Sequence, residues 1–98
     1  MRTVDEIYQF VQIAVTDEIE LPENWMNSRT EDCVDARYIL VNFLSSNGLS
    51  RKQIESKTGL PKTTVRQYIN TYSERIKTRK MMAMWSAKIG QKIGYKKQ

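Results

Sequence analysis

The sequence predicts an all-α fold, a single small domain of four to five helices that contains a helix-turn-helix. Apolar residues recur every three or four positions along most of the 98 residues, as they do on the buried side of a helix. Three segments open with Ser or Thr followed three residues later by Glu or Gln, which is the capping box of a helix start. No segment shows the convincing alternation of apolar and polar residues that is typical of a strand.

The first predicted helix starts after a capping box of Thr3 and Glu6 and ends near Glu18. Its apolar residues have helical spacing: Val4, Ile7, Val11 and Val15. A linker of about residues 20–27 follows, and it contains Pro22 and the large apolar Trp25. We expect Trp25 to pack this linker onto the core, because an indole ring buries a large apolar area. Contact with a partner protein is the alternative role for this side chain.

The second predicted helix, about residues 30–46, follows a capping box of Ser28 and Glu31. It is apolar over much of its circumference, so we expect it to be the central helix of the core. The single cysteine, Cys33, lies in this apolar pattern and is therefore expected to be a buried structural thiol. The pair Asn47-Gly48 ends the helix.

Two further helices joined by a tight turn are predicted for about residues 50–78, and together they form the helix-turn-helix. The third capping box, Ser50 with Gln53, opens the first of them. Gly59 suits the left-handed position just past its end, where a side chain would clash. The second begins at residue 61 or 62 and continues to about residue 78. The residues expected to face inward are Ile54, Leu60, Val65 and Tyr68.

The tail, residues 79–98, is predicted to be basic and amphipathic. Its large apolar residues recur every three or four positions: Met81, Met82, Trp85, Ile89 and Ile93. Three interpretations of this pattern are open. The tail completes the core, it forms the seam of a homodimer, or it holds another protein through its adaptable methionine side chains.

Charge is strongly segregated along the chain. The formal net charge is +5, but residues 1–35 carry a net charge of −7 and residues 36–98 a net charge of +12. Such segregation produces a strong local field, and a polyanion is the expected partner of the basic part.

The composition disfavours several classes of function. With no histidine and one cysteine, the chain has no internal disulfide and no thiolate or imidazole zinc site, so we expect no cofactor. We expect no enzyme, because catalysis would depend on carboxylates in a predicted loop with no pocket implied. No stretch approaches the ~20 apolar residues of a membrane span, and no signal peptide is visible. We therefore expect a cytoplasmic protein with no membrane and no small-molecule partner.

The polar side chains of the predicted helix-turn-helix are those that bind duplex DNA. We expect Ser50, Arg51 and Lys52 to contact phosphates, since they open the first helix of the motif. The expected contacts of the second helix, which suits the major groove, are Lys62, Thr63, Thr64, Arg66, Gln67 and Asn70. If about five basic side chains neutralise phosphates, log K against log salt should have a slope of roughly −4 to −5.

Three segments together resemble the C-terminal DNA-binding domain of the bacterial replication initiator DnaA. They are VDARYILVNFL (residues 34–44), LSRKQI (residues 49–54) and TTV (residues 63–65). The resemblance covers about residues 30–76. It implies that Arg37 approaches the DNA backbone and that Lys62, Thr63 and Thr64 read the major groove.

The chain also departs from this family. Pro61 and Lys62 stand where the family has Asp-His, so its preferred DNA box is not expected here. No Gly-rich phosphate-binding loop precedes the module, which therefore resembles a detached DnaA-like or TrpR-like unit of a small regulator or a phage-derived gene. The segment GLPKTTV (residues 59–65) is also similar to helix-turn-helix segments of IclR-type regulators and of sigma-factor promoter-reading domains.

Two functions follow as hypotheses. The first is sequence-specific binding of double-stranded DNA by a small regulator of transcription or replication. The alternative is a protein-interaction adaptor that uses the acidic N-terminal helix and the Met- and Trp-bearing tail, with the basic helix incidental.

Overall fold

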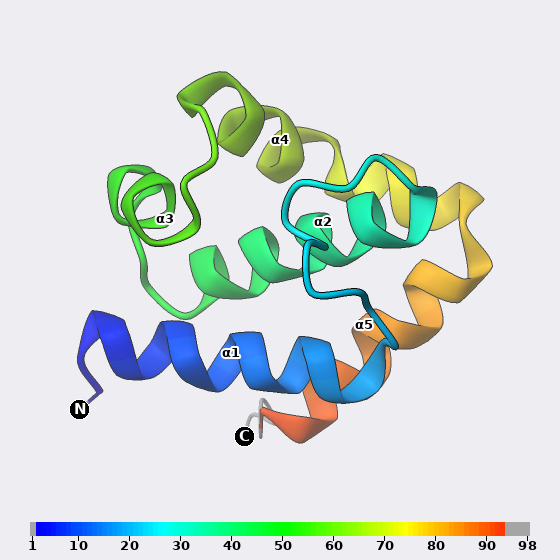
Figure 1. Ribbon diagram of the computed structural model, residues 1–98, viewed down its shortest axis with the longest axis horizontal. Helices are drawn as coiled ribbons and strands as arrows, with labels where there is room; N and C mark the ends of the chain where they lie inside the picture. Colours follow the sequence, from blue (N-terminus) through cyan, green and yellow to red (C-terminus); the bar gives the residue numbers. More distant parts are fainter. Residues whose placement is uncertain (1, 94–98) are drawn as a thin grey trace.

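The computed structural model describes residues 2–93, and this part of the chain folds into five helices with no strand (Figure 1). In chain order they are α1 (Val4–Glu18), α2 (Glu31–Ser46), α3 (Arg51–Thr58), α4 (Lys62–Thr78) and α5 (Lys80–Lys92). The predicted all-α class and number of helices are confirmed. None of these helices has the length and apolarity that crossing a membrane requires.

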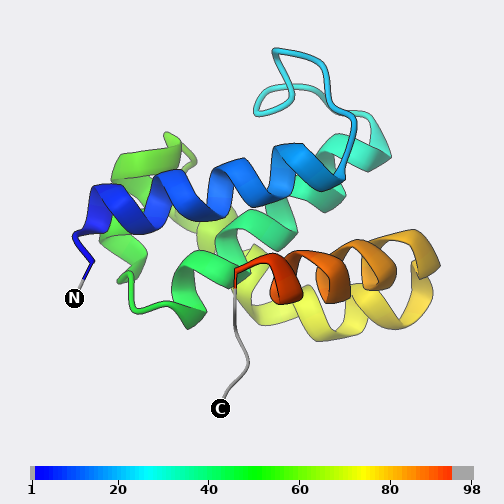
Figure 2. The ribbon, with the colours of Figure 1, turned by 90° about the horizontal axis from the view of Figure 1, so that it is seen from below.

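Helix α2 lies in the middle of the molecule and contacts each of the other four helices. In Figure 1, α1 runs along one side of α2 and α4 along the other, and Figure 2 shows α5 beside α1. Ten of the sixteen residues of α2 are buried, as expected for a helix that is apolar over most of its circumference. They include Cys33, whose predicted burial is thereby confirmed.

Two of the three predicted capping boxes are present. At the start of α1, the Thr3 hydroxyl accepts the Glu6 amide at 3.1 Å, and the Glu6 carboxylate accepts the Thr3 amide at 2.9 Å. At the start of α3, Ser50 and Gln53 make the same reciprocal pair at 3.2 and 2.9 Å. Each box satisfies two backbone amides that have no partner inside the helix, so it fixes where the helix begins.

The third predicted box, Ser28 with Glu31, is wrong. The N-cap of α2 is Thr30, so Glu31 is the first helical residue and lies too early to close a box. Ser28 belongs to the preceding loop, where its hydroxyl accepts the Thr30 amide at 3.3 Å. Its carbonyl accepts a hydrogen bond from the Arg37 guanidinium at 2.8 Å, and this contact with α2 holds Ser28 outside the helix.

Helix α5 completes the core. Four of the five apolar residues that the tail pattern singled out are buried, namely Met82, Trp85, Ile89 and Ile93. Met81 is 49% exposed. Met84, which was not part of the predicted pattern, is 42% exposed. Of the three interpretations of the tail, packing into the core therefore describes most of its apolar residues, and the predicted tail beyond residue 93 lies outside the described residues.

A buried carboxylate joins α2 to the junction of α4 and α5. Asp35 has no exposed surface, and its two oxygens accept the Nε–H groups of Arg75 at 2.8 Å and Arg79 at 2.6 Å. Arg79 is the one residue between α4 and α5, and it also donates to Glu31 at 3.1 Å. The pKa of Arg79 is raised above its ordinary value, first by its hydrogen bond to Asp35. This cluster fixes the direction in which α5 leaves α4.

Candidate nucleic-acid interface

The turn between α3 and α4 is built around Gly59. Its φ of +75° and ψ of 7° lie in the left-handed region, which a residue with a side chain adopts only with strain. Its amide donates to the Glu55 carbonyl at 2.8 Å, and this bond closes the end of α3. The Thr58 hydroxyl then accepts the Leu60 amide at 3.2 Å and donates to the Ile54 carbonyl at 2.7 Å. The turn is therefore held by three hydrogen bonds at its start and leads directly into α4.

Helices α3 and α4 are joined to the core by the residues that their spacing predicts. Ile54 and Val65 are fully buried, Tyr68 is 8% exposed, and Leu60 is half-buried against the core. Tyr68 packs its ring on that of Tyr38 in α2, with ring centroids 4.2 Å apart. Because the inner side of α4 is packed in this way, its remaining side is left to solvent.

The outer side of α4 carries the predicted contacts of the second helix. Five of these side chains are exposed and one, Thr64, is half-buried. The exposed five are Lys62, Thr63, Arg66, Gln67 and Asn70. None of the six makes a side-chain hydrogen bond or an ion pair with another residue in the range 2–93.

The start of α3 adds three polar residues beside α4. Arg51 and Lys52 are exposed, and neither has an ion pair within the described part of the chain. The Ser50 hydroxyl accepts the hydrogen bond of the Gln53 amide, so Ser50 is the N-cap of α3. We call the nine residues of these two groups the α3–α4 surface: Ser50, Arg51, Lys52, Lys62, Thr63, Thr64, Arg66, Gln67 and Asn70.

Arg37, the tenth predicted contact, does not belong to this surface. It is 7% exposed, and its Nη1 donates to the carbonyls of Trp25 and Ser28, while its Nε donates to the Tyr68 hydroxyl at 3.4 Å. The guanidinium thus holds the loop between α1 and α2 onto α2 and α4. The same loop packs Trp25, 6% exposed, into the core, as its size predicts. The structure gives Arg37 a packing role at this place.

The cations of the molecule divide into paired and unpaired groups. Lys57 is paired with Asp5, and Lys88 and Lys92 lie 3.8 Å from carboxylate oxygens at the end of α1. In the range 2–93, the Lys and Arg residues with no ion pair, side-chain hydrogen bond or cation–π contact are Arg29, Arg51, Lys52, Lys62, Arg66, Lys77 and Lys80. Four of these seven belong to the α3–α4 surface.

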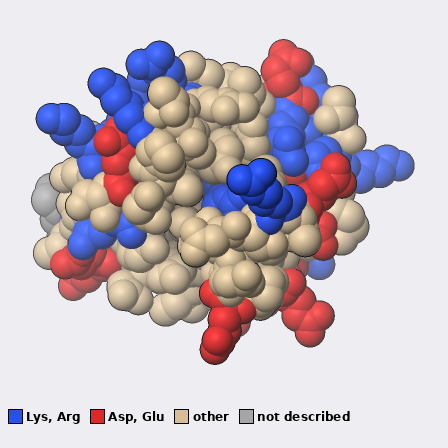
Figure 3. Space-filling model, turned by 45° about the horizontal axis from the view of Figure 1, so that its top comes forward, with Lys and Arg blue, Asp and Glu red and all other residues tan. Residues whose placement is uncertain are grey.

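The space-filling view shows where the positive charge lies. In Figure 3, Lys and Arg side chains gather at the left, over α3 and the start of α4, and again at the right, over the end of α4 and the start of α5. Both groups are on the face turned to the viewer. The right-hand group was not among the predicted contacts. The helical periodicity of the sequence could have found it, because it places Lys77 on the same side of α4 as Lys62.

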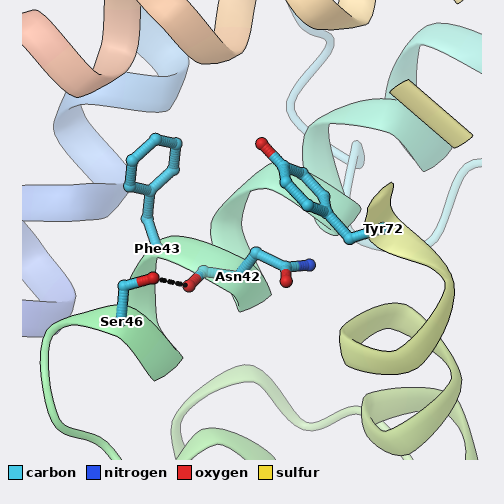
Figure 4. A pocket seen from close by; sticks show the side chains of 4 residues that line it. All are labelled: Asn42, Phe43, Ser46 and Tyr72. Atoms are coloured by element: carbon cyan, nitrogen blue, oxygen red, sulfur yellow. Dashed lines mark hydrogen bonds between the residues drawn. The ribbon is translucent and has the colours of Figure 1, made fainter. Parts of the chain in front are cut away.

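A shallow hollow between α2 and α4, about 270 Å³ in volume, is lined by Asn42, Phe43, Ser46 and Tyr72 (Figure 4). The Asn42 amide group donates to the carbonyls of Tyr38 at 2.9 Å and Tyr68 at 3.0 Å, and Ser46 donates to the Asn42 carbonyl at 2.9 Å. The bond from Asn42 to the Tyr68 carbonyl connects α2 to α4, and the other two lie within α2. No cluster of three or more potential metal ligands occurs among the residues that the structure describes.

Comparisons with known proteins add no assignment. No protein-family model matches the chain, and neither the curated proteins nor the solved structures contain a significant match. The resemblance to the DnaA C-terminal domain therefore stays a prediction that depends on the three sequence segments alone.

Proposed function

We propose that the chain binds double-stranded DNA in a sequence-specific manner, as a small regulator of transcription or replication. One observation carries the proposal. The inner side of α4 is locked into the core by Val65 and Tyr68, while its outer side is exposed and its polar side chains have no partner within residues 2–93. An exposed helix of about 10–12 Å diameter matches the major groove, which is about 12 Å wide.

The side chains on the outer side of α4 have the chemistry of base readout. Arg66 suits the two acceptors of guanine, and Gln67 and Asn70 suit the donor and acceptor of adenine. Thr63 offers a hydroxyl for a hydrogen bond and a methyl group for contact with thymine. Arg66 and Asn70 are separated by four residues, so they lie one above the other on α4 and would reach neighbouring base pairs.

The cations of the α3–α4 surface supply the attraction to phosphates. Arg51, Lys52, Lys62 and Arg66 are unpaired within the described chain, so binding releases counterions from the DNA without first breaking ion pairs in the protein. With Arg66 engaged on a base, the other three side chains neutralise three phosphates, and log K against log salt has a slope of about −2.7. These contacts position the module, while the base contacts of α4 give it sequence preference.

Selection from a random duplex library tests the proposal. The full chain should enrich a defined motif, and the selected duplex should resist competition by mixed-sequence DNA. Arg66→Ala should lower the affinity for the selected duplex by about 1–3 kcal/mol, which is roughly five- to 150-fold. Lys88→Ala is the matched control, because Lys88 is an exposed helical cation on α5 that lies beside Glu18. Equal affinity for all duplexes, or equal losses in the two variants, would contradict sequence-specific binding.

One observation favours a second candidate, a contact between two copies of the chain through α5, which is the dimer seam that the tail pattern also allowed. Met81 and Met84 are 49% and 42% exposed on α5, and methionine side chains adapt to varied apolar partners. If these residues form a contact between chains, Met81→Gln with Met84→Gln should leave the unfolding midpoint nearly unchanged. The elution volume on a sizing column should increase only if the wild-type chain associates through this side.

A further inference from the structure

The exposed residues of α4 continue well beyond the α3–α4 surface. Five of them succeed one another at intervals of three or four residues and therefore lie along one line of the helix: Lys62, Arg66, Asn70, Ser73 and Lys77. All five are exposed, and none of their side chains is paired within residues 2–93. The line has cations at both ends and short polar side chains in its middle.

The far end of this line carries two available cations. Lys77 lies in the last turn of α4, and Lys80 opens α5 after the single junction residue. Both are exposed and without an ion pair in the described part of the chain. Their neighbours Arg75 and Arg79 are held by Asp35, so they are engaged inside the protein. Figure 3 shows this end of α4 on the same face as the α3–α4 surface.

The length of the line decides what its far end would meet on a duplex. Lys62 and Lys77 are 15 residues apart, which is about 22 Å at 1.5 Å per residue. The major groove is only about 12 Å wide. A helix that crosses the groove with its start inside it therefore extends past the groove edge and reaches a sugar-phosphate backbone.

We infer that Lys77 and Lys80 form a second phosphate-binding pair, which meets the DNA backbone about 22 Å along α4 from Lys62. The inference rests on the DNA binding proposed above and extends it. In this arrangement α4 contacts the duplex along its whole outer side, and not with its first turns alone. The neutral Asn70 and Ser73 then lie over the groove between two cationic ends.

Glu74 places a carboxylate near the far end of this line. It is exposed, four residues after Asn70 and three before Lys77, so it lies on the same exposed side of α4 as the cations. Residues three apart on a helix have Cβ atoms about 5–6 Å apart, so Glu74 lies close to Lys77. A phosphate bound at Lys77 would therefore be repelled by the Glu74 carboxylate, because this distance is shorter than the Debye length of about 10 Å at 0.1 M salt. Removal of the Glu74 charge should therefore strengthen binding to the second pair.

The test measures the salt dependence of binding to a mixed-sequence duplex of about 24 base pairs, which is ~80 Å long. With five phosphate contacts, from Arg51, Lys52, Lys62, Lys77 and Lys80, the wild-type slope should lie near −4.5, and Lys77→Ala with Lys80→Ala should make it shallower by about 1.8. Near 0.1 M salt this variant should bind at least about tenfold more weakly. Lys88→Ala with Lys92→Ala removes the same charge from the other end of α5 and should change the slope by less than about 0.5.

Glu74→Gln should raise the affinity for DNA, whereas the lysine variant should lower it. This gain cannot be explained by misfolding, because a misfolded variant would lose affinity. Glu74→Gln should bind about two- to threefold more tightly near 0.1 M salt. If the wild-type chain binds the duplex but the variant lacking Lys77 and Lys80 keeps its slope, or loses no more than the control, the second pair is refuted and the proposed function stands. Unchanged affinity of Glu74→Gln would also refute it. If the wild-type chain binds no duplex at all, the proposed function itself fails.

Discussion

Asp35 is the residue on which the junction of α2, α4 and α5 depends. Its buried carboxylate is shared by Arg75 and Arg79, whose side chains are each about a quarter exposed. Asp35→Ala leaves both guanidinium groups without this partner, and breaking such a pair costs about 3–5 kcal/mol where both charges are buried. Because water partly solvates the two arginines, we expect a loss of roughly 2–3 kcal/mol in the free energy of unfolding. Urea unfolding followed by circular dichroism measures this loss.

Asp32 is the matched control for this prediction. It lies one turn earlier on α2 and is exposed, with no ion pair among the described residues. Its charge acts only through the favourable position in the first turn of the helix, so Asp32→Ala should cost about 0.5 kcal/mol. Similar losses in the two variants would show that the Asp35 cluster adds nothing beyond helix electrostatics.

Single-residue roles were predictable where one helix decides them and not where a distant segment does. The exposure of Lys62, Arg66 and Asn70 follows from the helical periodicity of α4. Once the apolar residues define the buried side of the helix, the remaining positions define its exposed side. The burial of Arg37 depends on the Trp25 and Ser28 carbonyls, which are twelve and nine residues away in a loop of irregular path. The family resemblance predicted a contact with the DNA backbone at position 37, whereas the structure buries this side chain.

At the scale of secondary-structure elements, α3 depends strongly on its N-terminal cap. The helix has only eight residues, and a single side chain, Ile54, anchors it fully in the core. Ser50→Ala removes the acceptor of the Gln53 amide and should lower the free energy of unfolding by about 1 kcal/mol. Ser28→Ala should cost less than about 0.5 kcal/mol, since that hydroxyl caps no helix. Equal midpoint shifts in urea would contradict this difference.

Helix boundaries were predictable because most of them are set locally. The boxes at Thr3 and Ser50 use only residues within one turn, and Gly59 ends α3 by its own backbone conformation. The start of α2 was predicted at about residue 30, close to Glu31, but its cap was assigned to Ser28 instead of Thr30. The Ser28 carbonyl is bonded by Arg37, nine residues away, and a local pattern does not contain this contact.

At the scale of the whole molecule, the segregation of charge along the sequence becomes a partial segregation in space. The end of α1 lies toward the right in Figure 1 and the linker after it crosses the middle of the view, whereas α3 and the start of α4 lie at the left. Asp17 and Glu18 at this end are neutralised in part by Lys88 and Lys92. The acidic charge that remains is carried by side chains such as Glu20 and Glu23, which are exposed and have no ion pair in the range 2–93.

This arrangement predicts a repulsion of DNA that depends on salt. The molecule measures 34 × 30 × 26 Å, so charges at its opposite ends are farther apart than the Debye length of about 8 Å at physiological salt. At 0.01 M salt the Debye length is about 30 Å, and the two ends then interact. The linker carboxylates should therefore weaken and orient DNA binding at low salt only.

Glu20→Lys with Glu23→Lys tests this electrostatic orientation. The variant should bind a mixed-sequence duplex several-fold more tightly than the wild-type chain near 0.01 M salt, and within about twofold of it near 0.15 M salt. Glu20→Gln with Glu23→Gln changes the charge by half as much, so its gain in log affinity should be about half. Fluorescence anisotropy at both salt concentrations measures the effect. An equal gain at low and high salt would place the linker against the duplex, because only charges within a few ångströms of a phosphate escape screening.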